Sequence, residues 1–250
     1  MCSSDLLKHI VNRMGFELVR IPRMDAGGTA PEHEITRPVA TYSPWNRDTA
    51  FRAAYAEIEP YTLVDVYRCY ELWQLVEQTA GLGRGSLVEI GVWRGGTGAL
   101  IARRAAICGI PDKVFLCDTF TGVVKAGARD SLYRGGEHAD TSRQDVEDLL
   151  HDRLGLDNAE ILEGIFPDET GPGVEHLDFR FCHIDVDVYQ SARDIVDWIW
   201  PRIVPGGIVV YDDYGSFNCG GITAHVEEQR MCGDRLLIHN LNGHAIVVKR

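Results

Sequence analysis

Residues 86–98 read SLVEIGVWRGGTG, and this stretch decides the fold class. The first five residues form a short apolar run typical of a buried strand, and four glycines follow within the next eight residues. Glycine lets a backbone approach a ligand closely, and a helix that begins after such a turn offers free N–H groups to a carboxylate or phosphate. The stretch therefore predicts the first strand–turn–helix unit of a doubly wound α/β fold with a ligand at the turn. The alternative is a glycine-rich turn that binds nothing.

Strand and helix patterns alternate on both sides of this stretch. The predicted strands are residues 86–90, 113–117, 159–162, 179–184 and 207–211. The predicted helices are residues 63–79, a helix from the glycine turn to Cys108, residues 141–154 and residues 190–200, with Ser142 and Asp145 spaced as an N-terminal capping pair. Strands separated by helices need crossover connections, which give a parallel sheet covered on both faces.

The end of the chain breaks this alternation. Two strand-like runs, Leu236–His239 and Ala245–Lys249, flank Asn242-Gly243, which is a strong signal for a tight hairpin. A mostly parallel seven-stranded sheet that ends in an antiparallel hairpin is the Rossmann-like arrangement of class I methyltransferases. A NAD-binding domain would continue with another crossover.

Residues 1–60 differ from the rest of the chain. Apolar residues recur at helical spacing between Leu6 and Met14, and a stretch rich in turn formers follows from Pro22 to Pro44. Long loops in compact domains tend to be lids or binding segments. We therefore interpret residues 1–60 as an N-terminal cap and residues 61–250 as the catalytic domain.

Composition narrows the class of partner. The formal net charge is -12 and the pI is near 5.2. An acidic surface repels phosphate backbones and anionic lipid, so neither nucleic acid nor a membrane is an expected partner. The seven cysteines form no CxxC pair, and the N-terminus lacks the layout of a signal peptide. These features predict a reduced, cytoplasmic protein.

The glycine turn favours an amino-acid ligand over a dinucleotide. Its spacing is Glu-x-Gly-x-x-x-Gly, from Glu89 through Gly91 to Gly95, and not Gly-x-Gly-x-x-Gly. Glu89 would repel a pyrophosphate and attract an ammonium group, so a zwitterionic amino-acid moiety fits better. Asp118 ends the second predicted strand, where an acid can accept hydrogen bonds from ribose hydroxyls. Alone, such an Asp often only starts a turn.

Two aspartate pairs follow the last two predicted parallel strands. Asp185 and Asp187 follow residues 179–184, and Asp212 and Asp213 follow residues 207–211. Open α/β sheets bind ligands at this edge, and a hard cation such as Mg²⁺ relieves the repulsion among gathered carboxylates. The alternative is that all four residues are turn formers.

Two histidines are candidate bases. His183 lies inside an apolar strand, where a hydrogen-bonded core imidazole is the favoured interpretation. His138 lies in a polar loop that could reach over the site or stay solvated.

Taken together, the motifs resemble the macrocin O-methyltransferase family, which also includes mycinamicin and novobiocin sugar methyltransferases. The resemblance runs from about Tyr61 to Glu228. It rests on residues 89–96, 118–120, 164–168, 183–189 and 205–214.

The resemblance implies S-adenosylmethionine- and Mg²⁺-dependent transfer of a methyl group to a sugar hydroxyl of a secondary metabolite, such as an antibiotic glycoside. It implies Asp185, Asp212 and Asp213 as metal ligands, with Asp185 also the general base and His138 a second catalytic candidate. The cofactor contacts that it implies are Thr62, Glu89, Gly91, Gly95, Asp118, Thr119 and Gly164. A homodimer or higher homo-oligomer is expected.

Other functions share parts of this pattern. Catechol methyltransferases place a lysine soon after the first metal-binding Asp, and residues 186–189 contain none. A NAD-dependent oxidoreductase would need the missing dinucleotide motif. A metal-dependent glycosyltransferase could use Asp185-Val186-Asp187 but leaves the Glu89 turn unexplained, and a non-catalytic protein would not need every acid.

Overall fold

The structure, a computed structural model, describes residues 11, 13–14, 36 and 40–250. Contacts divide the chain into two units, Met1–Pro38 and Val39–Arg250. Most of the helix expected near residues 6–14 and most of the turn-rich stretch lie outside the described residues. In the part of the chain that is described, no helix is long and apolar enough to cross a membrane.

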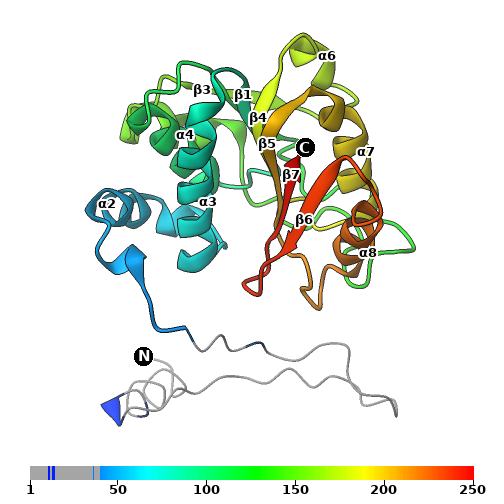
Figure 1. The fold of residues 1–250 in the computed structure, drawn as a ribbon, viewed down its shortest axis with the longest axis horizontal. Coiled ribbons are helices and arrows are strands. Elements are labelled where there is room, and N and C mark those ends of the chain that lie inside the picture. Colours follow the sequence, from blue (N-terminus) through cyan, green and yellow to red (C-terminus); the bar gives the residue numbers. More distant parts are fainter. Residues whose placement is uncertain (1–10, 12, 15–35, 37–39) are drawn as a thin grey trace. The chain divides into compact units, whose positions relative to one another are not determined.

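The second unit is built on a seven-stranded sheet with the order β3-β2-β1-β4-β5-β7-β6 (Figure 1). The first five strands are parallel, and β7 pairs antiparallel with both β5 and β6. The strands are β1 (Ser86–Ile90), β2 (Val114–Asp118), β3 (Ala159–Glu163), β4 (Phe179–Ile184), β5 (Ile203–Tyr211), β6 (Arg235–His239) and β7 (Ala245–Lys249). The predicted fold class is confirmed.

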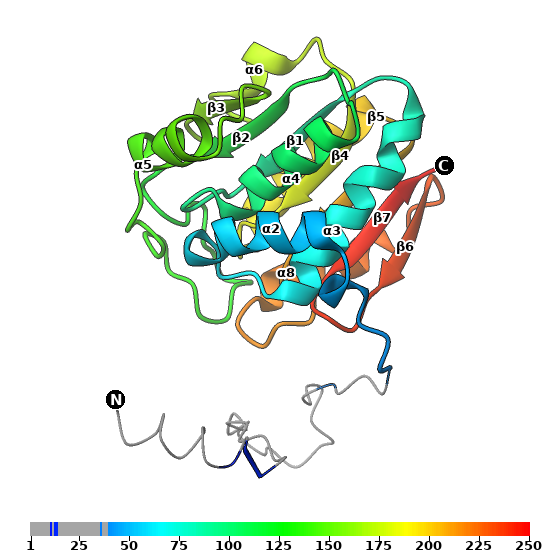
Figure 2. The ribbon, with the colours of Figure 1, turned by 90° about the vertical axis from the view of Figure 1, so that its left-hand side faces the viewer.

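Helices cover both faces of the sheet. Helices α2, α3 and α4 lie on one face, and α7 and α8 lie on the other (Figures 1 and 2). The α-helices are α2 (Thr49–Ile58), α3 (Val66–Thr79), α4 (Gly96–Ile107), α5 (Arg143–Glu147), α6 (Gly171–Val174), α7 (Tyr189–Ile199) and α8 (Gly220–Gln229). Short 3₁₀ segments are η1 (Pro44–Asn46), η2 (Glu59–Tyr61), η3 (Ala80–Leu82) and η5 (Trp200–Arg202), and η4 (Asp148–Arg153) is a π-helix.

The alternation of side chains along each strand divides the core into two layers. In β1, Leu87 packs in the cluster under α3 and α4, whereas Val88 and Ile90 pack in the cluster under α7 and α8. All five residues of β1 are buried, which explains why its sequence reads as a continuous apolar run. Glu89 is the one charged residue of β1, and its side chain points to the same face of the sheet as that of Leu87.

Local side chains explain where the structure departs from the predicted boundaries. α3 begins at Val66 and not at residue 63, because the carboxylate of Asp65 accepts hydrogen bonds from the N–H groups of Tyr67 and Arg68. The predicted cap at Ser142 is present, where its hydroxyl accepts from the N–H of Asp145 at 3.2 Å.

The C-terminal hairpin is present, but its turn is longer than a two-residue Asn-Gly turn. Asn240 and His244 close the loop, with the N–H of Asn240 donating to the carbonyl of His244 at 3.0 Å. Residues 241–243 form its tip, and Gly243 has a φ of +102°. The helices α2, α6 and α8 were not predicted: α6 has only four residues, α8 begins with two glycines, and α2 lies within the residues interpreted as a cap.

The helix α2 belongs to the compact second unit, since that unit begins at Val39. The ring of Phe51 on α2 packs edge-on against Tyr70 and Trp73 of α3, with centroid distances of 4.8 and 5.8 Å. Residues 49–58 therefore help to bury the α3 face of the core. That residues 1–60 act as a cap stays a prediction.

Candidate active site

A cavity of about 290 Å³ opens at the carboxyl ends of the parallel strands. Its walls come from the loops after β1, β2, β3, β4 and β5, together with residues 61–64 and the first turn of α3. Most of the predicted site residues line it: Thr62, Gly91, Asp118, Thr119, His138, Gly164, Asp185, Asp187, Asp212 and Asp213. The fold thus gathers at one edge residues that are up to 151 positions apart, from 62 to 213.

Asp118 organises the glycine turn. Its Oδ2 accepts hydrogen bonds from the backbone N–H groups of Val92 and Trp93 at 2.7 and 2.8 Å, and its Oδ1 accepts from Phe120 at 2.7 Å. The carboxylate at the end of β2 therefore holds the turn after β1 in place. A direct contact between Asp118 and a ribose stays a prediction.

Gly91 joins the turn after β1 to the loop after β4. Its φ is +86°, and a Cβ added there would lie 1.7 Å from the carbonyl oxygen of Asp185. The N–H of Asp185 in turn donates to the carbonyl of Ile90 at 2.9 Å. The candidate cofactor turn and the first candidate metal ligand are thereby packed directly on one another, with no room for a side chain between them.

We expect Gly91→Ala to destabilise the protein far more than Gly83→Ala. Gly83 has a similar φ of +78° but open space where its Cβ would lie. Gly83→Ala should therefore cost only the backbone strain, about 1–2 kcal/mol. Gly91→Ala adds the steric overlap, about 1–3 kcal/mol more. Urea unfolding of both variants measures the difference, and equal losses would show that the loop after β4 moves away freely.

Two predicted cofactor residues do not line the cavity. Glu89 is fully buried, and its Oε1 lies 2.7 Å from Nδ1 of His183. Its Oε2 lies against the start of α4, where a Cβ on Gly98 would come within 2.6 Å. Gly95 takes a left-handed conformation before α4 and faces Val146. Their contacts with a cofactor stay predictions.

The N-terminus of α4 lies directly against residues 61–62. Among the described residues no side chain caps this helix. Gly96 lies so close to Tyr61 and Thr62 that an added Cβ would come within 2.7 Å of the Tyr61 carbonyl. The free N–H groups of a first helical turn suit a carboxylate, so Thr62 lies where the amino-acid end of a cofactor is expected.

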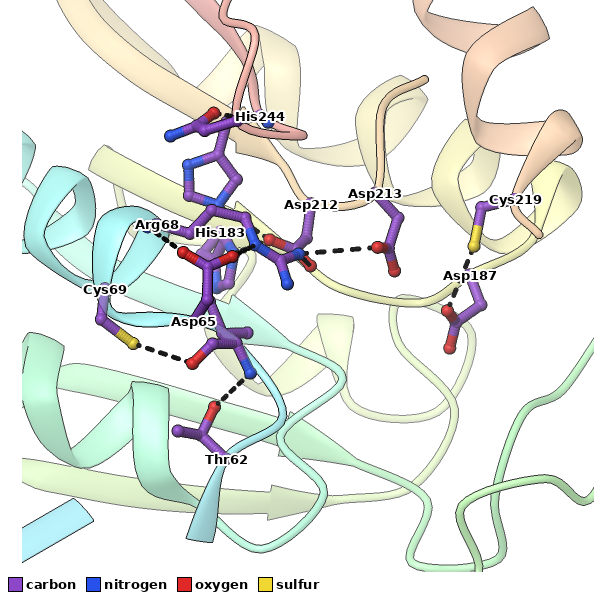
Figure 3. Close-up of polar contacts among 12 residues, drawn as sticks. Thr62, Asp65, Arg68, Cys69, His183, Asp187, Asp212, Asp213, Cys219 and His244 are labelled. Carbon is purple, nitrogen blue, oxygen red and sulfur yellow. Dashed lines mark hydrogen bonds and ion pairs between the residues drawn. The ribbon is translucent and has the colours of Figure 1, made fainter. Parts of the chain in front are cut away.

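Three aspartates converge beside this turn. One carboxylate oxygen from each of Asp185, Asp212 and Asp213 lies within 4.8 Å of the others. Figure 3 shows Asp212 and Asp213 side by side after β5, with Asp187 farther along toward Cys219. The Sγ of Cys219 is 3.5 Å from Oδ1 of Asp187. Asp187 therefore lies on the far side of Asp213 from Arg68.

Asp212 is ionised and held on both oxygens. Its Oδ1 lies 2.8 Å from Nε2 of His244, and its Oδ2 accepts a hydrogen bond from Nη1 of Arg68. Burial alone would raise the pKa of Asp212, but the imidazoles of His183 and His244 and the charge of Arg68 lower it far below its ordinary value. Arg68 also lies 3.5 Å from Oδ1 of Asp213.

The pKa values of the other two carboxylates are raised instead of lowered. Burial and the charges of Asp212 and Asp213 raise the pKa of Asp185 well above its ordinary value. Burial and the charges of Asp212 and Asp187 raise the pKa of Asp213 to about 7. Gathered carboxylates repel one another, and hard oxygen donors are the ligands that Mg²⁺ prefers. The donor set therefore fits a divalent cation, and a guanidinium already lies beside it.

Two histidines link Asp212 to two further acids, Glu71 and Glu89. The Nδ1 of His244 lies 2.6 Å from Oε2 of Glu71, and its Nε2 faces Asp212. His183 continues the chain to Glu89, while its Nε2 is 3.9 Å from Oδ1 of Asp212 and has no hydrogen-bond partner among the described residues. His183 is thus a buried imidazole and not part of the cavity wall.

Sequence reasoning missed Arg68, Glu71 and His244. Arg68 and Glu71 lie on a helix that reads as an ordinary amphipathic segment, and His244 follows the hairpin glycine. None carries a motif.

His138 also lines the cavity. It has a φ of +63°, and its Nε2 is 3.5 Å from the hydroxyl of Tyr133. Burial and the charge of Asp187 raise the pKa of Tyr133 far above its ordinary value, so the phenol stays protonated. The Tyr133 hydroxyl is therefore a protonated polar group near Asp187, with His138 beside it.

Comparison with known proteins gives relatives for both the sequence and the fold. A 171-residue stretch is 34% identical to 8-demethyl-8-(2,3-dimethoxy-alpha-L-rhamnosyl)-tetracenomycin-C 4'-O-methyltransferase of Streptomyces olivaceus, covering 64% of each chain. A 169-residue stretch is 28% identical to demethyldecarbamoylnovobiocin O-methyltransferase of Streptomyces niveus, covering 62% of each chain. The matches therefore span less than two thirds of these relatives' own lengths.

Solved structures agree with the sheet topology. The O-methyltransferase NovP superposes with a TM-score of 0.65 at 27% identity, covering 76% of this chain and 82% of NovP. The calicheamicin methyltransferase CalS11 superposes with a TM-score of 0.58 at 15% identity, covering 89% of this chain and 99% of CalS11, which shows a shared fold.

The fold is that of the class I, Rossmann-like methyltransferases. Residues 38–238 match the macrocin-O-methyltransferase (TylF) family. This match covers well over half of the chain, so the chain belongs to that family.

Proposed function

We propose that this protein is an S-adenosylmethionine- and Mg²⁺-dependent O-methyltransferase that acts on a hydroxyl of a sugar moiety in an antibiotic-type glycoside. The observation that carries the proposal is one cavity that joins the glycine turn held by Asp118 to the cluster of Asp185, Asp212 and Asp213. The named relatives are O-methyltransferases of a rhamnosyl tetracenomycin C and of demethyldecarbamoylnovobiocin.

In this proposal the two halves of the cavity have different tasks. The glycine turn and the N-terminus of α4 hold the amino-acid end of the cofactor, and the strand-end aspartates hold the acceptor side. When bound, S-adenosylmethionine supplies an electrophilic methyl group, and Mg²⁺ lowers the pKa of the acceptor hydroxyl. The contact between Gly91 and Asp185 keeps the two halves at a fixed separation, which an in-line transfer requires.

Asp185 is the proposed general base. A sugar hydroxyl is a poor nucleophile, so its proton must leave as the new carbon–oxygen bond forms. Burial and two neighbouring carboxylates raise the pKa of Asp185, which makes it a stronger proton acceptor once it is ionised. Asp212 suits a different task, since Arg68 and His244 keep it ionised and fixed as a ligand. His138, which also lines the cavity, is the second catalytic candidate.

The competing functions fit this site less well. A catechol methyltransferase would need a lysine soon after Asp185, and the loop before α7 contains none. Among the described residues that line the cavity, Arg68 is the only one with a permanent positive charge. Its guanidinium forms ion pairs with Asp65 and Asp212. The turn after β1 of this chain lacks the dinucleotide motif that a NAD-dependent oxidoreductase would need.

Ligand-dependent melting tests the cofactor. We expect S-adenosylhomocysteine to raise the melting temperature and NAD⁺ to leave it unchanged. At a hundredfold excess over Kd the gain is about 2.7 kcal/mol. For a chain of this length that corresponds to a shift of about 5–10 °C. A shift with NAD⁺ or with a nucleotide sugar, and none with S-adenosylhomocysteine, would overturn the assignment.

Three further expectations belong to the same proposal. Residues 1–60 close over the acceptor, the protein forms a homodimer or higher homo-oligomer, and it works in the cytoplasm. The acidic charge of -12 suits a small-molecule acceptor better than nucleic acid or a membrane.

A further inference from the structure

Arg68 occupies the space beside the aspartate cluster (Figure 3). It comes from the first turn of α3, and its side chain is only 15% exposed. Its Nε donates to Oδ2 of Asp65 at 2.8 Å, and its Nη1 contacts Oδ2 of Asp212 and lies 3.5 Å from Oδ1 of Asp213. One guanidinium therefore bridges two of the three candidate metal ligands to an acid outside the cluster.

A divalent cation would need an oxygen that Arg68 now holds. Both oxygens of Asp212 are engaged, Oδ1 with His244 and Oδ2 with Arg68. A cation coordinated by Asp212 and Asp213 would also lie within a few ångströms of the guanidinium, where like charges repel strongly in a partly buried site. Arg68 and the cation thus compete for the same carboxylates.

We propose that Arg68 is an exchangeable counter-cation that neutralises the aspartate cluster when no metal is bound and gives up its contact with Asp212 when a divalent cation enters. The inference rests on the metal site of the proposed function. Asp65 makes the exchange feasible. Its side chain is 43% exposed and holds Nε of Arg68, so the guanidinium keeps one ion pair after it leaves the cluster. Arg68 thereby sets the affinity of the site for its metal.

The test is Mn²⁺ binding to the metal-free full chain, measured by calorimetry and by electron paramagnetic resonance without any methyl acceptor. We expect Arg68→Gln to bind Mn²⁺ roughly tenfold or more tightly than the wild type, because a competing positive charge is removed. Arg68→Lys keeps the charge but cannot reach Asp65 and Asp212 together, so its Kd should fall between the two. Arg103→Gln is the matched control, since Arg103 pairs with Glu57 away from the cluster, and its Kd should equal that of the wild type.

Melting curves give a second measurement on the same proteins. In EDTA, Arg68→Gln should melt below the wild type because its carboxylates lack a counter-charge, and Mn²⁺ should raise its melting temperature by more than that of the wild type. If the wild type binds Mn²⁺ and Arg68→Gln binds it equally or more weakly, the exchange is wrong while the metal site stands. If no variant binds Mn²⁺, the metal site itself is wrong, and the exchange with it.

Discussion

Replacing Asp185 by asparagine is expected to lower kcat by about 10²–10⁴-fold, the range that general base catalysis typically contributes. Asparagine cannot accept the proton of the acceptor hydroxyl and is a weaker ligand for a hard cation. Binding of S-adenosylhomocysteine should change little, because the glycine turn is held by Asp118 and not by the Asp185 carboxylate. Calorimetry with S-adenosylhomocysteine and single-turnover methyl transfer to a panel of deoxysugar glycosides measure the two effects.

Asp178 provides the matched control for this substitution. It precedes the amino end of β4, whereas Asp185 follows the carboxyl end, and it pairs with the exposed Arg84. Asp178→Asn should leave turnover unchanged. If Asp185→Asn retains most of its turnover and His138→Gln does not, the base is His138. Asp185 would then act only as a metal ligand.

The fold was predictable because its signals are local. Four of the five parallel strands are buried along most of their length, so short apolar runs stand out between helical stretches. Gly91 and the Asn242-Gly243 pair mark a strand–helix turn and a hairpin, where backbone conformation requires glycine. The boundaries were less predictable, because a side chain such as Asp65 decides where α3 begins.

The candidate site was predictable only in part. Acids that directly follow a parallel strand must lie at the carboxyl edge of the sheet, which placed Asp118, Asp185 and Asp212 at the cavity. Side-chain direction is harder to predict. Glu89 sits within β1, one position before Ile90, and the pleat turns it under α4 toward His183, away from the cavity.

The partners of Asp212 could not be found from the sequence. Arg68 is 144 positions away and His244 is 32 positions away, on a helix and on the closing hairpin. Neither belongs to a motif, and only the packing of α3 and β7 beside β5 brings them to the same carboxylate. Such contacts between distant elements decide the charge of the site. The ionisation of its carboxylates therefore could not be predicted from the sequence.

Removal of divalent metal is expected to stop methyl transfer. After exhaustive chelation and dialysis, turnover should fall by at least about 10²-fold, since a metal ion supplies several kcal/mol of stabilisation to a developing alkoxide. Added Mg²⁺ should restore the rate. Three close carboxylates explain the expectation. Burial and mutual repulsion raise the pKa of Asp185 and so favour its protonated form, whereas a bound cation would favour the ionised form that can accept the proton of the hydroxyl.

The control for chelation is cofactor affinity in the same buffer. S-adenosylhomocysteine should bind equally well with EDTA and with Mg²⁺, because the glycine turn and the N-terminus of α4 are built from backbone groups and Asp118. Asp212→Asn should need more Mg²⁺ for half-maximal turnover, since it weakens a ligand and removes the carboxylate after β5 that pairs with Arg68. Undiminished turnover in the metal-free protein would mean that the aspartates bind the hydroxyls of the acceptor directly, with Arg68 as their permanent counter-charge.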